Sequence, residues 1–93
     1  MNPLPRIYAD FNKADGPGRV ILTCVGIQVD LQRLKLDLSG GMKAILYMPD
    51  VDENGKSDPL EVEATITRDE ANGWWVGDFE WKDLDHVSRR TSH

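Results

Sequence analysis

Five oxygen-bearing side chains in one polar stretch have the types and spacing that a hard cation requires. They stand at the first, third, fifth, ninth and twelfth positions of residues 50–61: Asp50, Asp52, Asn54, Asp58 and Glu61. Ca²⁺ takes about six to eight oxygen ligands, and a closing glutamate can supply two of them. Gly55, at the sixth position, permits the sharp turn that such a loop needs. This spacing predicts a calcium-binding loop as one hypothesis.

The stretch resembles the EF-hand calcium loop, D-x-[DN]-x-[DN]-G-x₅-E. An EF-hand places this loop between two helices. Here the preceding segment 41–49 is rich in β-formers and ends in proline, and the following segment 62–67 alternates as a strand does. The eighth position, which needs an apolar residue for pairing, is Ser57. The alternative is a solvated hairpin loop that turns at residues 53–55, with carboxylates that keep strand edges from pairing with other chains.

A second candidate site is a partner-binding surface around an aromatic residue. Its residues alternate along one expected strand and end in two carboxylates: Trp74, Val76, Asp78 and Glu80. Tryptophan is enriched among the residues that dominate protein interfaces. The alternative is that Trp74 lies against Tyr8 or a loop and closes a second small cluster.

A third group could imitate a hydrolytic or metal cluster. His86 follows Asp83 and Asp85 closely, and an imidazole beside carboxylates is what such chemistry uses. No nucleophile, second histidine or cysteine pair lies nearby in the sequence. We therefore interpret this group as surface charge, and we predict no catalytic residue and no resident cofactor.

Charge is distributed unevenly along the chain. The net charge is −5, but residues 50–85 hold twelve acidic residues against three basic ones, a net charge of −9 for that part. An acidic surface repels phosphate backbones, so nucleic-acid binding is disfavoured. The same surface attracts cations or a basic protein partner, and self-association is the other kind of partner we expect.

Composition indicates one domain over residues 1–93, with an extended N-terminus at 1–5 and a tail at 89–93. The single cysteine, Cys24, lies in an apolar run, so we expect a buried thiol and no internal disulfide. A reducing, cytoplasmic location fits this cysteine usage. No apolar run approaches the roughly 18 residues that a membrane span needs, so we expect no membrane segment.

Most of the elements that we expect to position the candidate site residues are strands. Residues 6–11 alternate, and residues 19–25 form a β-branched run after a glycine-rich turn, which predicts a hairpin. Residues 42–48 are nearly all apolar, which is typical of a central strand. Residues 85–88 could add a last brief strand.

Residues 26–38 fit two structures. Leu31, Leu34 and Leu38 keep helical spacing with Asp30 as a possible cap, whereas Leu34, Leu36 and Leu38 alternate as in a strand. We favour a short helical turn over residues 31–34, followed by an extended segment 35–38.

Residues 60–67 and 74–81 predict a hairpin joined by a turn at 69–73, where Asn-Gly is the strongest turn signal in the chain. If Ile66 lies opposite Gly77, then Ala64 meets Phe79 and Val62 meets Trp81. The expected core face has six members: Val62, Ala64, Ile66, Trp75, Phe79 and Trp81. A slip of one residue would turn Asp78 and Glu80 inward, which is costly for unpaired carboxylates.

Residues 60–87, and especially the segments 73–77 and 81–84, resemble the SH3-like small β-barrels. The resemblance implies an all-β fold, an SH3-like or partly open barrel of five to six short strands with one short helical turn. We interpret the chain as a non-catalytic protein-interaction module or subunit with an acidic face. The alternatives are a calcium-binding domain that uses the loop 50–61 and an enzyme with an unmarked carboxylate site.

Overall fold

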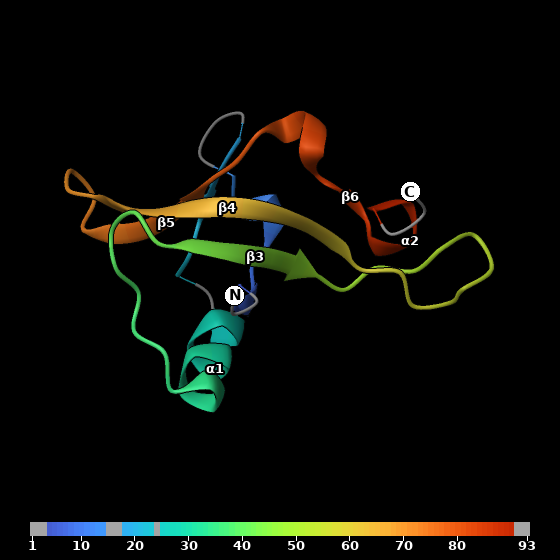
Figure 1. The fold of residues 1–93 in the computed structure, drawn as a ribbon, viewed down its shortest axis with the longest axis horizontal. Coiled ribbons are helices and arrows are strands. Elements are labelled where there is room, and N and C mark those ends of the chain that lie inside the picture. The colour runs from blue at the N-terminus through green and yellow to red at the C-terminus, as the bar shows by residue number, and fades with distance from the viewer. Residues whose placement is uncertain (1–3, 15–17, 24, 91–93) are drawn as a thin grey trace.

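The fold is mainly β and is built on one sheet, in agreement with the strand patterns of the sequence (Figure 1). The computed structural model describes residues 4–14, 18–23 and 25–90, so the prediction for Cys24 lies outside the described residues. The elements follow one another in this order: β1 Arg6–Tyr8, η1 Phe11–Lys13, β2 Arg19–Ile21, α1 Val25–Leu34, β3 Lys43–Met48, β4 Leu60–Asp69, β5 Trp74–Asp78, η2 Trp81–Asp83, β6 Asp85–His86 and α2 Val87–Arg90. In the described ranges, no helix is long and apolar enough to cross a membrane.

The six-stranded sheet does not close, and its strand order is β1-β3-β4-β5-β2, with β6 added beside β4. The predicted hairpin between residues 6–11 and 19–25 is wrong. β1 instead pairs in parallel with β3, where Ile7 lies beside Leu46. β2 pairs with β5, where Val20 lies beside Gly77. Alternation shows which face a strand buries, but it does not show which strand lies beside it.

Helix α1 is longer than the helical turn predicted over residues 31–34, because it begins at Val25. That start also shortens the strand predicted over 19–25, which ends at Ile21. The capping role predicted for Asp30 is wrong, since Asp30 lies inside the helix and is 7% exposed. The helix ends where Lys35 takes a left-handed φ of 52°, and residues 36–39 continue without regular structure.

The hairpin of β4 and β5 has the predicted register at its centre, because Ile66 pairs with Gly77. Gly73 turns the chain with a φ of +75° and donates its N–H to the carbonyl of Asp69. The ladder ends at the pair Thr65–Asp78, so the predicted pairs Ala64–Phe79 and Val62–Trp81 are wrong. Trp81 instead begins η2 and is 54% exposed, not buried in the core.

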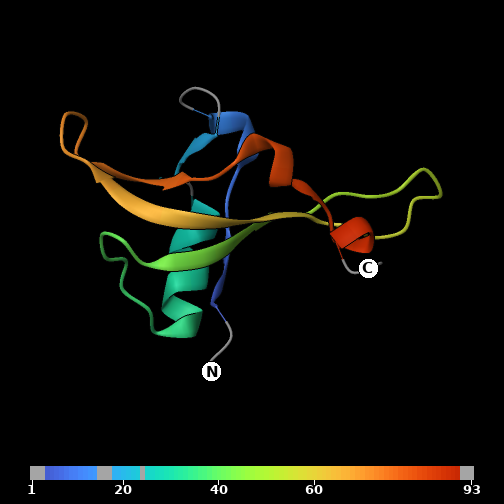
Figure 2. The same ribbon diagram turned by 45° about the horizontal axis from the view of Figure 1, so that its top comes forward.

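The chain leaves β4 after Asp78 and returns to it only at β6, where His86 pairs with Leu60. The strand predicted over 85–88 is therefore shorter, and Val87 already begins α2. Arg89 and Arg90, which were expected in the tail, belong to this helix, and residues 91–93 lie outside the described residues. α2 lies beside the loop that joins β3 and β4 (Figures 1 and 2).

The two faces of the sheet differ in chemistry. The core face buries aliphatic side chains from four strands (β1 to β4) and α1, with Phe11, Ala9 and Leu22 beside them: Ile7, Val20, Ile27, Ala44, Leu46, Val62, Ala64 and Ile66. Because side chains alternate along a strand, Glu63 and Thr65 of β4 point to the opposite face. Helix α1 contributes Ile27 to the core face, so α1 does not cover the opposite face of β3, β4 and β5, where η2 contributes Asp83 at the border.

Candidate functional site

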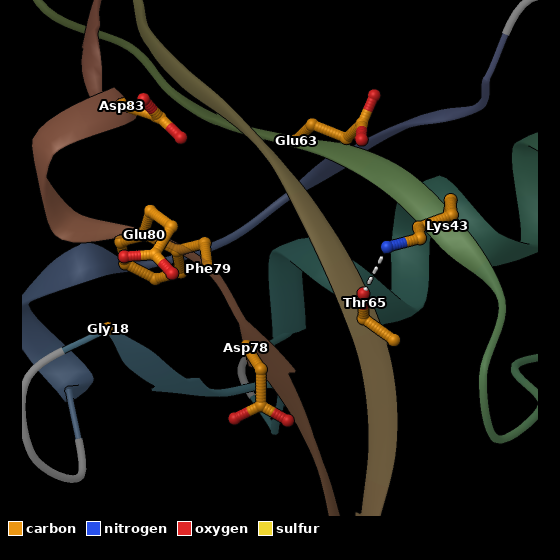
Figure 3. A pocket seen from close by; sticks show the side chains of 8 residues that line it. All are labelled: Gly18, Lys43, Glu63, Thr65, Asp78, Phe79, Glu80 and Asp83. Atoms are coloured by element: carbon orange, nitrogen blue, oxygen red, sulfur yellow. Dashed lines mark hydrogen bonds between the residues drawn. The ribbon is translucent and has the colours of Figure 1, made fainter.

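An open acidic hollow of about 690 Å³ lies on this face, where the segment after β5 separates from β4 (Figure 3). Eight residues from β3, β4, β5 and the segments beside them line it: Gly18, Lys43, Glu63, Thr65, Asp78, Phe79, Glu80 and Asp83. Four of these residues are carboxylates and only one is a cation. We call this group the acidic hollow.

The register of three strands places the polar wall of the hollow. Thr65 on β4 pairs with Lys43 on β3 and with Asp78 on β5. The Lys43 ammonium donates a hydrogen bond to Thr65 Oγ1 at 2.7 Å (Figure 3). On the same face, Thr67 Oγ1 donates to Asp78 Oδ2 at 2.8 Å. These bonds hold Lys43 and Asp78 across the strands, and Glu63 lies two residues before Thr65.

A close backbone approach forms the other side of the hollow. Phe79 donates its N–H to the carbonyl of Gly18 at 2.8 Å. Gly18 has a φ of +73°, and a Cβ atom there would collide with the carbonyl oxygen of Phe79. Glycine is therefore required at this position by both its conformation and its contact.

Aromatic rings continue from the hollow toward solvent. Phe79, which lines the hollow, packs edge-to-face on Phe11 with ring centroids 5.9 Å apart. Its ring also stacks with Trp81 at 5.7 Å and an interplanar angle of 26°. Phe79 therefore joins the buried Phe11 to the exposed indole of Trp81.

The hollow has the chemistry of a cation-binding surface. Its carboxylates come from separate elements, and Glu63, Glu80 and Asp83 are exposed to solvent. Within the part of the chain that the structure describes, no three His, Cys, Asp or Glu side chains are grouped to hold a metal ion. The arrangement fits the attraction of an ammonium or guanidinium group by charge and hydrogen bonds.

The calcium pattern is distributed over several different contacts. Asp50 Oδ2 lies 2.8 Å from His86 Nε2. Asp58 accepts from the Ser88 hydroxyl at 2.7 Å and from the Ser88 N–H at 3.0 Å. These hydrogen bonds lower the pKa of both carboxyls. The bond with His86 is the main cause for Asp50, and the bond from the Ser88 hydroxyl is the main cause for Asp58.

The other three residues of the pattern also have separate positions. Asp52 Oδ1 accepts the backbone N–H groups of Asn54 and Lys56, so Asp52 organises the turn of its own loop. Asn54 is exposed at that turn. Glu61 forms an ion pair with Arg6 at 3.1 Å on the sheet. The structure therefore has a strand-to-strand loop here, with a bridge between residues 51 and 57.

The predicted partner-binding surface divides into two parts. Asp78 and Glu80 line the acidic hollow. Val76 was expected to be exposed, and this is wrong, because it is 1% exposed. Its backbone lies between Thr67 of β4 and Ile21 of β2, so side chains on both neighbouring strands can cover it. Trp74 is half-buried, and its indole N–H has no hydrogen-bond partner among the described residues.

The three residues of the predicted cluster, Asp83, Asp85 and His86, do not lie together at one site. Asp85 Oδ1 lies 3.8 Å from His86 Nδ1, whereas Asp83 lines the acidic hollow. His86 is thus shared by Asp50 and Asp85 and attaches β6 to the loop after β3.

Sequence reasoning missed Lys43, Gly18 and Asp83 as members of the hollow. The alternation of residues 60–67 did place Glu63 and Thr65 on the solvent face, so that part of the wall had a usable signal. Gly18 had none, because its contact with Phe79 joins two distant segments.

Fold and site together define a small mainly-β domain with an acidic hollow on one face of an open sheet. No protein-family model, curated protein or solved structure gives a significant match to this chain.

Proposed function

We propose that this chain is a non-catalytic protein-interaction module or subunit that presents its acidic hollow to a basic surface of a protein partner. The observation that carries the proposal is the group of four carboxylates, with Lys43 as the one cation among the lining residues, on a sheet face that α1 does not cover. Such a field speeds the encounter with an oppositely charged protein and disfavours partners of like charge.

An SH3-like architecture and a cytoplasmic location are also part of this proposal. The SH3-like resemblance is supported by a β4–β5 hairpin that is followed by a short helical turn and a brief strand, η2 and β6. A cytoplasmic location is supported by the single cysteine of the chain.

A charge-neutralising pair of variants tests the proposal. Glu63→Gln with Glu80→Gln removes two exposed carboxylates from the hollow. Glu53→Gln with Glu70→Gln removes two exposed carboxylates elsewhere and is the matched control. Proteins bound by the wild-type chain in a lysate would be identified, purified and titrated against all three forms.

We expect a partner that binds the wild type and the control alike and binds the hollow variant more weakly, with the difference reduced by added salt. Sedimentation of the same three proteins covers self-association, the other kind of partner. If every purified partner and every oligomer forms equally well with the hollow variant, the acidic hollow is not an interaction surface.

A further inference from the structure

The exposed indole of Trp81 is the feature of the molecule that the acidic face alone does not explain. Trp81 is 54% exposed, one of four large hydrophobic residues described as exposed. The others, Val29, Leu34 and Val51, lie on α1 or in the loop after β3. Trp81 alone among them stacks on a residue that lines the acidic hollow, Phe79.

The aromatic pair is positioned by contacts with the rest of the fold. Phe79 is fixed by its N–H bond to Gly18 and by its edge-to-face contact with Phe11. Trp81 lies nearly parallel to Phe79, at an interplanar angle of 26°. A large ring that is positioned before binding loses little conformational entropy when a partner packs on it.

Charge complementarity identifies the group that fits beside this ring. Glu80 directly precedes Trp81, Lys82 follows it, and Asp83 comes next. Glu80 and Asp83 line the hollow together with Glu63 and Asp78. A guanidinium is planar and can stack on an indole while its edge donates hydrogen bonds to carboxylates. An ammonium forms the charge contact but has no flat face to stack, and a nucleobase would bring phosphates that these carboxylates repel.

We infer that Trp81 and the acidic hollow form one docking surface for an arginine-bearing segment of a protein partner, with the guanidinium on the indole and its N–H groups directed to the carboxylates. The inference rests on the proposed function and deepens it by naming the side chain that is recognised. It commits to arginine over lysine, and to Trp81 in place of the predicted Trp74 as the aromatic anchor.

Two peptides that differ only in their basic residue test this inference on the full chain. The probes are acetyl-Gly-Arg-Gly-Arg-Gly-amide and its lysine counterpart, titrated while the amide and indole N–H signals are followed by NMR. We expect the arginine peptide to shift the Trp81 indole signal and the amides of 78–83, and to bind about two- to fivefold more tightly than the lysine peptide, which is the factor of an exposed cation–π contact.

Variants separate the ring from the charge. Trp81→Ala should abolish the preference for arginine, and Trp81→Tyr should restore part of it, which guards against a loss due to misfolding alone. Val51→Ala, at another exposed hydrophobic residue, is the matched control and should change nothing. Glu63→Gln with Glu80→Gln should weaken both peptides.

The outcomes distinguish this inference from the proposed function. If both peptides bind equally, Trp81→Ala has no effect and the charge variant weakens binding, the arginine anchor is overturned while the acidic interaction surface stands. If neither peptide binds at millimolar concentration, the docking surface is overturned, and the purified partner with its charge variants then judges the proposed function separately.

Discussion

Asp30 Oδ2 accepts two hydrogen bonds, one from the Tyr47 hydroxyl at 2.9 Å and one from the backbone N–H of Tyr8 at 2.8 Å. Asp30 comes from α1, Tyr47 from β3 and Tyr8 from β1, at the end of the sheet path. A strand at a sheet edge has N–H groups that no neighbouring strand accepts. Asp30 therefore supplies the acceptor for β1 and attaches the helix to the sheet at the same point.

Replacement of Asp30 should destabilise the fold. Asp30→Ala leaves the Tyr8 N–H and the Tyr47 hydroxyl without this acceptor. Each unsatisfied group costs about 1–3 kcal/mol, so we expect the free energy of unfolding to fall by about 2–6 kcal/mol, nearer the lower value because both bonds are part-buried. Asp37→Ala, at an exposed carboxylate, is the control and should change stability by about 0.5 kcal/mol or less. Urea unfolding measures both, and equal losses would contradict this role for Asp30.

The pH dependence of stability should reveal the same carboxylate. Burial alone raises the pKa of Asp30, but hydrogen bonds from Tyr8, Tyr47 and Arg33 outweigh it and hold the pKa below the ordinary value of 3.8. A carboxyl whose pKa is lower in the folded state stabilises the protein fully above its unfolded pKa, near 4, and loses this effect as the pH falls through the folded pKa.

Asp30→Asn does not titrate, so it isolates this effect. The difference in unfolding free energy between wild type and Asp30→Asn should be constant near neutral pH and should shrink as the pH falls below about 4. Urea unfolding at a series of pH values measures it. A difference that grows on acidification would show that the folded pKa of Asp30 is raised.

Local signals made the β4–β5 hairpin predictable from the sequence. Alternation over residues 60–67 and the Asn72-Gly73 turn indicated the same register, and a slip would have turned Asp78 toward the core. The prediction failed after Asp78, because the Phe79 N–H bonds to Gly18 and takes the chain away from β4. Nothing local to Phe79 encodes that contact.

Contacts between segments distant in the sequence explain why the other features could not be predicted. β1 pairs in parallel with β3, and Asp30 of α1 accepts the Tyr8 N–H, so β1 is placed by contacts with segments distant in the sequence. Asp30 looked like a cap because aspartate is common at helix starts, and only the folded position of Tyr47 shows its role. Two of the four residues predicted for partner binding, Asp78 and Glu80, do line the hollow. The alternation of β5 predicted the face of Val76 but could not predict that Val76 is buried there.

Two glycines with nearly the same φ allow the cost of a left-handed conformation to be measured apart from the cost of a steric contact. Gly18 and Gly73 have φ values of +73° and +75°, but only at Gly18 would a Cβ atom meet another group, the Phe79 carbonyl. Both Gly→Ala changes should cost about 1–2 kcal/mol for the left-handed conformation. Gly18→Ala should cost about 1–3 kcal/mol more for the steric overlap, as in overpacked sites. Urea unfolding compares them, and equal costs would mean that the Gly18–Phe79 approach is not close in solution.

Calcium should leave the stability of this protein unchanged, although the loop pattern predicts a site. To gather Asp50, Asp58 and Glu61 around one ion, the chain would have to break their contacts with His86, Ser88 and Arg6. We expect no shift of the thermal midpoint at about 1 mM Ca²⁺, the weak end of the range for extracellular calcium modules. Mg²⁺ at the same concentration controls for charge screening, which acts on any acidic surface. A midpoint raised by Ca²⁺ but not by Mg²⁺, and lost in Glu61→Gln, would show that the loop rearranges and binds the ion, because a ligand that binds only the folded state must stabilise it.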